Sequence, residues 1–467
     1  MLFLIKIRNF KYRGNGMTEN YEKARSRTFR EIFLIYAAIY VCLGFYSVNM
    51  EEIISNLIGA TEVWMAIILA CHFSVLIVST LLFGYYGEKL SERYSKKKIF
   101  VVTNLIWVIS YGLIAFSINQ INFLILIITG AVGIGAFIPL GFSMIGDFYP
   151  PKQRGDKYGQ MQIGLLVGSG GGIIFGGLLG GYVGTMGWRF AYGLGAILGL
   201  AAVIGYSLRG INPQRGRDEP EFKDFKGSIE YNYRITLKKL KELFKSKTII
   251  IIIFYVLLSG IATTTLGNWW SLYLTNYKYN DEFLITVIYL LSGLGAIPGS
   301  FIGGRLGDQF FRKGKLRRRV LISLIGLIPG VLLWLAFYKL PFYQVTALQV
   351  VLSTLFFILI GFIGYMLSSF PVGNQFAIYS EVSVPEARGT ANALNWMMVN
   401  FGGIIGNLII SSFIETNIAL LPVAVTSVLL IWFFGSFLWI FVFFTYPKEA
   451  KRTSDTLLRR RRELEEI

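Results

Sequence analysis

Long apolar runs alternate with short polar segments along the whole chain. Each run is roughly 20 to 28 residues long, and a helix of that length crosses a hydrocarbon core of about 30 Å because it rises about 1.5 Å per residue. This pattern predicts an all-α membrane protein with twelve transmembrane helices. The twelve runs cover residues 31–54, 62–86, 99–118, 122–148, 157–183, 188–208, 248–275, 283–304, 320–338, 349–379, 389–412 and 418–446.

Composition agrees with this class, because 54% of the 467 residues are hydrophobic and only 15% are charged. Many of the 51 glycines lie inside the apolar runs. Glycine recurs at every fourth position from Gly164 to Gly180. Small residues at that spacing predict a helix that packs closely on a neighbour.

Basic residues predict the orientation of the helices. Of 45 Lys and Arg residues, 42 fall in the two tails and in five loops, 87–98, 149–157, 209–247, 305–319 and 380–388. The positive-inside rule therefore places both termini and these loops in the cytoplasm. The net charge of +18 is then mostly a topological signal, and no nucleic-acid partner is expected.

The longest polar stretch divides the chain into two halves. We expect an N-terminal tail over 1–30, a six-helix bundle over 31–208, a cytoplasmic central loop over 209–247, a second six-helix bundle over 248–446 and a tail over 447–467. Apolar residues recur with helical spacing in 229–247, which predicts an amphipathic helix on the inner membrane face. A solvated linker explains the same charges equally well.

A charged motif appears once in each half. Asp147 ends an apolar run and is followed by a proline-bearing turn and then Arg154-Gly155, and the same order returns as Glu381, a turn and Arg388-Gly389, 234 residues later. Membrane proteins built from two similar halves are typically secondary transporters, with the site between the halves. The repeat therefore predicts transport.

The second loop of each half carries a further motif. Gly304-Arg305-Leu306-Gly307-Asp308 precedes Arg312 and Lys313, and Leu90-Ser91-Glu92-Arg93 is a degenerate first copy. With twelve spans, a long central loop and six-plus-six pseudo-symmetry, the chain resembles the major facilitator superfamily. The resemblance implies that family's fold of two pseudo-symmetric six-helix bundles with cytoplasmic termini.

Three segments are similar to the Spinster-like branch of that superfamily: Gly146 through Arg154, Pro213-x-Arg215-Gly216-x-x-Glu219, and Gly303 through Asp308. This branch transports amphipathic lipids, notably lysophospholipids, so the resemblance implies such a substrate. The chain departs from the branch in the fourth run, where Thr129 and Ala136 flank Gly133-Ile134-Gly135 in place of an arginine and a glutamate.

The charged loop residues are candidates for a cytoplasmic gate. A carboxylate at a helix end can meet an arginine and the free N–H groups at the start of a neighbouring helix, and such contacts can hold one state of a transporter closed. Asp147 and Glu381 are the expected acidic partners. The alternative is that these charges only end helices and set topology. The candidate gate residues are Glu92, Arg93, Asp147, Arg154, Asp308, Glu381 and Arg388.

Apart from Tyr and Cys, the only titratable residue near the middle of the predicted spans is His72 in the second run. A histidine at that depth is a candidate to carry a coupling proton, and a hydrogen-bonded structural role is the alternative. Glu51 is a second coupling candidate if the first span is longer than predicted, and a solvated end otherwise. Because the predicted spans hold no deep carboxylate, uniport is an alternative to coupled transport.

The resemblance implies a substrate cavity between the halves, lined by runs one, four, seven and ten. Aromatic side chains with few polar groups favour an amphipathic, largely apolar ligand. Aromatic residues near span ends can equally serve as interface anchors. The candidate cavity residues are Tyr40, Tyr46, Asn49, Thr263, Asn268, Trp269, Trp270, Tyr365, Asn374, Gln375, Asn395, Trp396 and Asn400.

Together these features predict a monomeric secondary transporter in the cell membrane that moves an amphipathic solute, with a lysophospholipid-like lipid favoured, by alternating access. The alternatives are a broad drug/proton antiporter, a uniporter of another small organic solute, and a non-transporting receptor or scaffold. No enzyme activity, cofactor or metal is expected, because the sequence shows no nucleophile–base pair, phosphate loop or metal motif.

Overall fold

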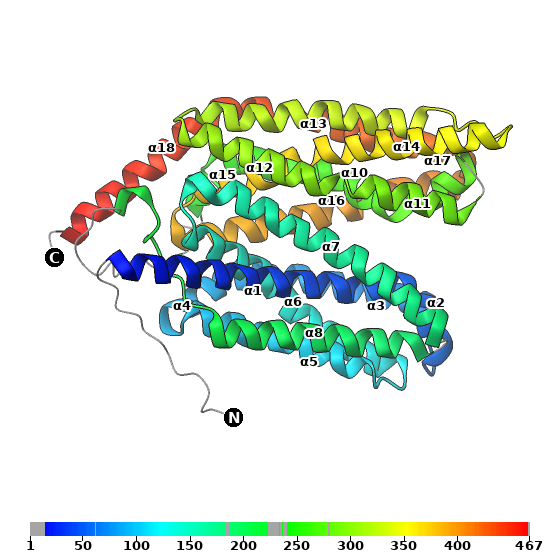
Figure 1. The fold of residues 1–467 in the computed structure, drawn as a ribbon, viewed down its shortest axis with the longest axis horizontal. Coiled ribbons are helices and arrows are strands. Elements are labelled where there is room, and N and C mark those ends of the chain that lie inside the picture. The colour runs from blue at the N-terminus through cyan, green and yellow to red at the C-terminus, as the bar shows by residue number, and fades with distance from the viewer. Residues whose placement is uncertain are drawn as a thin grey trace. The chain divides into compact units, whose positions relative to one another are not determined.

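The computed structural model describes residues 15–60, 62–183, 186–222, 233, 236, 241–278 and 281–465. Across these residues the regular structure is helical, and a parallel bridge joins Ile58 to Asn119 (Figure 1). Polar side chains begin several helices, as when the Ser95 hydroxyl accepts the Lys98 backbone N–H at 3.3 Å. Such caps satisfy N–H groups that have no partner inside the helix.

The chain forms two compact units. The first contains the described residues up to Phe148 together with Val167–Gln214, and the second contains Tyr149–Leu166 and the described residues from Arg215 onward. Helix α7 (Pro151–Val183) contributes its beginning to the second unit and its remainder to the first.

The first unit packs its long helices directly against one another, with α5 against α6 and α8, α6 against α3, and α8 against α1. On α7 the glycine stripe meets α1, because a Cβ at Gly168 or Gly172 would overlap the backbone carbonyl of Ala37 or Val41. This close approach agrees with the four-residue glycine spacing. Its helices are α1 (Asn15–Val48), α2 (Met50–Asn56), α3 (Glu62–Leu82), η1 (Phe83–Gly87), α4 (Glu88–Arg93), α5 (Lys96–Ile114), α6 (Gln120–Phe148) and α8 (Gly187–Arg209).

In the second unit, two apolar runs that were each predicted as one helix are divided into two helices. The predicted run 349–379 is broken at Ser369, where Pro371 in the first turn of the next helix has no N–H to continue the ladder. The run 283–304 is broken before Ala296. The elements are η3 (Pro220–Phe222), α10 (Lys247–Tyr277), α11 (Glu282–Gly293), α12 (Ala296–Arg312), α13 (Leu316–Lys339), α14 (Ala347–Ser368), α15 (Phe370–Val382), η4 (Pro385–Ala387), α16 (Arg388–Thr416), η5 (Ile418–Leu420), α17 (Leu421–Ser436) and α18 (Leu438–Glu465).

Among the described residues, ten stretches are long and apolar enough to span a membrane. The predicted runs 62–86 and 157–183 are helical in α3 and α7 but are not among the ten, so a count of twelve spans stays a prediction. The ten are Asn20–Phe45, Lys96–Ile114, Gln120–Phe148, Gly187–Arg209, Lys247–Trp270, Leu284–Arg312, Leu316–Lys339, Ala347–Val382, Pro385–Thr416 and Ile418–Leu464.

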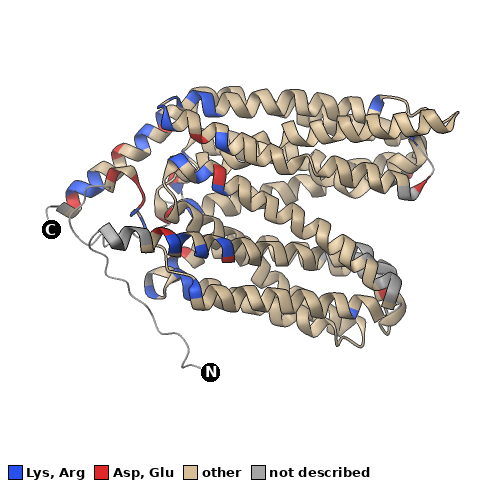
Figure 2. Cartoon of the chain, viewed as in Figure 1, with Lys and Arg blue, Asp and Glu red and all other residues tan. Residues whose placement is uncertain are grey.

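Lys and Arg gather at one end of the helices in each unit, which we call its charged end (Figure 2). In the second unit this end includes the start of α13 and the last part of α18, which runs on to Glu465, well past the predicted span end at residue 446. The amphipathic helix predicted over 229–247 falls mostly outside the described residues.

Candidate functional site

A buried cluster of charges at the charged end of the second unit contains two of the candidate gate residues. Arg319, near the start of α13, donates from Nη2 to Asp308 Oδ1 at 2.5 Å and from Nη1 to Glu381 Oε1. The hydroxyl of Tyr446 donates to the second oxygen of Glu381. Arg319 and Asp308 are both fully buried. Charges removed from water have to be paired and hydrogen-bonded, as these are.

Asp308 also accepts two backbone N–H groups near the start of α7. Its two oxygens accept the backbone N–H groups of Gly155 at 3.1 Å and Asp156 at 2.8 Å. Gly155 and Asp156 are the fifth and sixth residues of α7, so they lie near its N-terminus, where the positive end of the helix dipole favours a carboxylate. The carboxylate thus contacts both an arginine and a helix N-terminus.

Glycines allow the backbones at this contact to approach closely. A Cβ at Gly155 would lie 2.8 Å from Asp308 Oδ1 and 2.9 Å from the Gly304 carbonyl oxygen, and a Cβ at Gly304 would overlap the carbonyl of Gly155. Either position requires glycine for steric reasons, since real Cβ contacts are longer. The beginning of α7 therefore rests directly on the backbone of α12.

The two arginines of the sequence repeat meet at one carboxylate from the central loop. Arg154 and Arg388 each donate from Nη2 to Glu219 Oε1 at 2.5 Å. Burial raises the pKa of the Glu219 carboxyl, and the two guanidiniums more than offset this, so its pKa lies below the usual value. We call Arg154, Glu219 and Arg388 the repeat-arginine cluster.

The first unit has a similar buried cluster around Lys96. The ammonium of Lys96 lies 2.9 Å from Glu88 Oε1 and 2.9 Å from Asp147 Oδ2, and it donates to the Ser143 hydroxyl at 2.7 Å. As with Arg319, a cation at the start of a helix holds an acid from the preceding helix and an acid near the end of the following apolar stretch, which for Arg319 is Ala347–Val382. Both units therefore use the same kind of contact.

Sequence reasoning missed four of these charged residues. Lys96 and Arg319 stand in runs of basic residues that look like topological signals, Glu88 replaces an expected glycine, and Glu219 lies in a loop. Asp147 and Glu381 were expected to be the acidic partners of the gate; the structure pairs Asp147 with Lys96 and Glu381 with Arg319, and neither cation was predicted. The retained Pro-x-Arg-Gly-x-x-Glu spacing was the available signal for Glu219.

Another candidate gate residue, Arg93, is not brought into these clusters. Arg93 is exposed at the end of α4, with its guanidinium carbon 5.5 Å from the centre of the Tyr94 ring. The side chain of Glu92 lies outside the described residues.

The coupling candidate His72 is buried in α3. Its Nδ1 lies 3.4 Å from the Ile127 carbonyl oxygen, and Phe73 meets its ring edge-on at 5.4 Å. Its Nε2 has no hydrogen-bond partner among the described residues. The side chain of the other candidate, Glu51, lies outside the described residues.

Four cavity candidates of the second unit make two separate sets of contacts, one between α10 and α16 and one among α10, α11 and α14. Asn407 Oδ1 accepts from Asn268 Nδ2 at 3.2 Å and from Trp269 Nε1 at 2.8 Å. The ring of Trp270 stacks on Tyr289 with centroids 4.1 Å apart, and the hydroxyl of Tyr365 donates to that of Tyr289 at 3.4 Å. Asn407 and Tyr289 were not predicted.

Other cavity candidates make local packing contacts. Asn374 is fully buried and donates to the Gly303 carbonyl at 3.0 Å, which joins α15 to α12, while Gln375 donates to Asn395. The remaining contacts are Thr263 to the Ser259 carbonyl, Asn400 to the Trp396 carbonyl, Asn49 to the Phe45 carbonyl, and Tyr40 edge-on to Tyr36. The side chain of Tyr46 lies outside the described residues.

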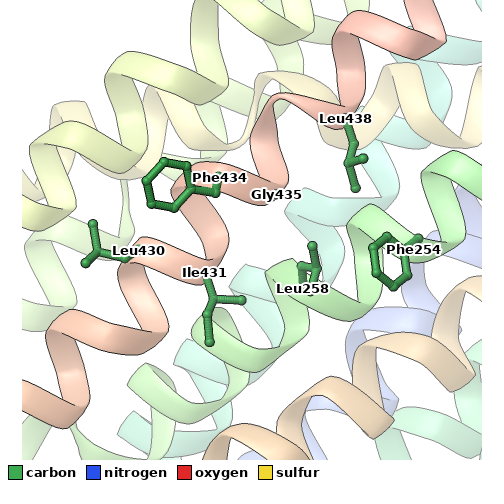
Figure 3. Close-up of a pocket in the computed structure, with 7 residues that line it drawn as sticks. All are labelled: Phe254, Leu258, Leu430, Ile431, Phe434, Gly435 and Leu438. Atoms are coloured by element: carbon green, nitrogen blue, oxygen red, sulfur yellow. The ribbon is translucent and has the colours of Figure 1, made fainter.

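An apolar cleft of about 380 Å³ lies between α10 and the α17–α18 junction (Figure 3). None of the candidate cavity residues lines it, and its lining offers no charged or polar side chain, so it suits only apolar ligand chemistry. The lining residues are Phe254, Leu258, Leu430, Ile431, Phe434, Gly435 and Leu438.

Comparison with known proteins places this geometry in a family. A family model described as Major Facilitator Superfamily matches residues 32–407. The chain belongs to this superfamily. Its members among the relatives below are transporters, and the expectation of a transporter in place of an enzyme is confirmed.

Curated relatives carry several transport names. The chain is 23% identical to the hexuronate transporter of Bacillus subtilis (strain 168), over 72% of this chain and 76% of that protein. It is 24% identical to multidrug resistance protein 3 of the same organism, over 71% and 69%. It is 28% identical to protein spinster homolog 1 of Xenopus laevis, over 70% of this chain and 60% of that protein.

Solved structures agree on the fold. A bacterial homolog of the human lysosomal transporter Spinster, inward-facing and unoccupied, matches with a TM-score of 0.55 and 16% identity over 91% of this chain and 98% of that one. A proton:xylose symporter matches with a TM-score of 0.63 and 14% identity over 90% and 96%. The predicted superfamily and the Spinster-like resemblance are confirmed.

Proposed function

We propose that this chain is a secondary transporter of the cell membrane that moves an amphipathic organic solute, with a lysophospholipid-like lipid favoured, by alternating access. The observation that carries the mechanism is the contact of Asp308 with the backbone N–H groups of Gly155 and Asp156 near the start of α7. Charge-assisted hydrogen bonds of this kind contribute about 1.5–3 kcal/mol each, enough to hold one state without making it permanent. We take the charged ends to be cytoplasmic and the protein to act as a monomer.

The gate works through α7, because this helix begins on α12 and continues into the first unit. When the start of α7 moves away from Asp308, water replaces the N–H groups of Gly155 and Asp156 as partners of the carboxylate. Closing reverses this exchange. The repeat-arginine cluster and the Arg319 cluster then act as two parts of one gate, and the Lys96 cluster stabilises the matching end of the first unit.

The substrate class is supported by the side chains between α10 and its neighbours. Trp270, Tyr289 and Tyr365 supply aromatic surface, and Asn268 and Asn407 supply a few hydrogen-bonding groups. This combination suits a ligand that is mostly apolar with one polar end. Similarity to spinster homolog 1 supports the same class.

The test is movement of a fluorescent lysophospholipid in proteoliposomes, with and without an imposed pH gradient. Movement that depends on the protein supports the lipid proposal, and its absence under both conditions overturns it. If the gradient drives accumulation, His72→Gln should abolish accumulation and leave downhill movement intact. If the gradient has no effect, the protein is a uniporter.

A second candidate, a broad drug/proton antiporter, is favoured by similarity to multidrug resistance protein 3. Proton-driven export of a lipophilic cationic dye from the same vesicles, without lysophospholipid movement, would select it. Absence of flux for every solute tested would instead select a receptor or scaffold.

A further inference from the structure

The last part of α18 lies beyond the predicted final span and packs on the loops of the second unit. We call residues 447–465 the C-terminal arm. Its Leu457 is buried, and a face of the arm contacts η3 and η4, the two short helices that border the repeat-arginine cluster. The arm therefore has a packed face in the described structure.

The contact with η4 is a buried ion pair. Arg460 donates from Nη2 to Glu386 Oε1 at 3.1 Å and from Nη1 to Glu386 Oε2 at 3.3 Å. Glu386 is fully buried and Arg460 is 7% exposed. Because Glu386 stands two residues before Arg388, this two-point contact holds the backbone from which Arg388 extends.

The contact with η3 holds the other side of the cluster. Ser454 donates its hydroxyl to the Glu221 carboxylate, and Arg461 donates to the Glu221 backbone carbonyl at 3.0 Å. Glu221 stands two residues after Glu219. Turn hydrogen bonds from Glu219 N–H to the Gly216 carbonyl at 3.2 Å and from Phe222 N–H to the Glu219 carbonyl at 3.1 Å complete this segment.

We propose that the C-terminal arm positions the repeat-arginine cluster, with Arg460 as the positioning residue that keeps Glu219 on Arg154 and Arg388. A glutamate in a loop loses conformational freedom when it is held at a buried site, which opposes the contact. The arm restricts this freedom before the ion pairs form, because it binds both η3, next to Glu219, and η4, next to Arg388. The proposal extends the gate described above, and its first test does not depend on transport.

The test is amide hydrogen exchange of residues 216–222 in the full-length protein in lipid nanodiscs. Arg460→Gln should raise exchange at the Glu219 and Phe222 amides by at least about tenfold, because one charge-assisted hydrogen bond to a buried group contributes that much or more. The matched control is Arg459→Gln, since the neighbouring Arg459 side chain is 72% exposed. The control should change exchange less than about twofold.

Two further variants separate a specific contact from general damage to the helix. The charge swap Arg460→Glu with Glu386→Arg should restore slow exchange, and Ser454→Ala should raise exchange by about threefold without removing a charge. Unchanged exchange in Arg460→Gln, or an equal rise in Arg459→Gln, overturns the proposal.

A transport readout separates positioning from folding once a substrate is known. Arg460→Gln should alter the maximal rate of transport and leave the KM for substrate unchanged, because the arm touches the gate and not the solute. If no solute is transported, the hydrogen-exchange result still decides the role of the arm, while the proposed function fails by itself.

Discussion

Replacing Asp308 by asparagine removes one negative charge from the contact that holds α7 on α12. The carboxylate accepts from Arg319 and Gly155 through one oxygen and from Asp156 through the other. Asparagine keeps one acceptor and presents an NH₂ group in place of the second, so one hydrogen bond is lost and two lose their charge assistance. The nearby Glu381 is then the partner of Arg319 without competition, which offsets part of the loss.

The net destabilisation of the closed contact should be about 1–3 kcal/mol, because hydrogen bonds to charged groups contribute about 1.5–3 kcal/mol each before this offset. Since about 1.4 kcal/mol corresponds to a factor of ten, the closed-to-open ratio should fall by roughly 5- to 150-fold. A gate that is mostly closed would then populate its open form measurably.

Pulsed electron–electron double resonance between two spin labels measures the populations of the closed and open forms. Spin labels at the exposed positions Lys152 and Lys313 report the separation of α7 from the end of α12, in a background where Cys42 and Cys71 are replaced by serine. Wild type should give a single short distance, and Asp308→Asn should add a longer one.

The matched control is Asp156→Asn, whose carboxylate pairs with Arg305 at 3.1 Å in a contact where the arginine is 57% exposed. Exposed pairs of this kind contribute about 0–1 kcal/mol, so the control should leave the distance distribution nearly unchanged. An unchanged distribution in Asp308→Asn, or an equal change in the control, would refute the idea that this carboxylate holds the gate.

Three further predictions concern packing and charge. Gly304→Ala should lower the melting temperature in a fluorescence scan because its methyl group overlaps a carbonyl, whereas Gly193→Ala, with open space around its Cβ, should not. The docking of Glu219 should be intact above the ordinary glutamate pKa of about 4.3 and be lost as the pH falls through its depressed pKa; a spin label at position 220 that becomes mobile at pH 6 would contradict this. Lys96→Met should destabilise the first unit by about 3–5 kcal/mol in denaturant titration, because the buried carboxylates of Glu88 and Asp147 lose their cation. An unchanged unfolding midpoint would show that Lys96 is not what stabilises these carboxylates.

Several parts of the architecture could be predicted because they depend on local or periodic features. Long apolar runs have to be helices in a membrane, since each backbone N–H and C=O group must find its partner within the segment. The glycine spacing in α7 predicted a close neighbour for the same kind of reason, because small residues at every fourth position fall on one helix face. The repeat around Arg154 and Arg388 could be recognised because the same residue types, a carboxylate, a proline-bearing turn and an Arg-Gly pair, occur in the same order in both halves.

The pairing of charges needed the tertiary structure. Arg319 follows Arg317 and Arg318, and nothing in that run says which guanidinium turns inward to reach Asp308 and Glu381, 11 and 62 residues away. The same holds for Lys96 among three consecutive lysines. The amides of Asn374 and Gln375 join helices, and the sequence did not predict these partners, because the direction of a side chain depends on which helix packs beside it.

The sequence by itself determined the class, the positions of most long apolar helices and the family, because apolar length, glycine spacing and the order of motifs can be read along the chain without knowledge of its packing. Only the tertiary structure decided that Glu219 joins the two repeat arginines and that Arg460 grips the loop beside them. Those contacts join residues 65 to 169 positions apart, and their stability comes from burial, which no local pattern records.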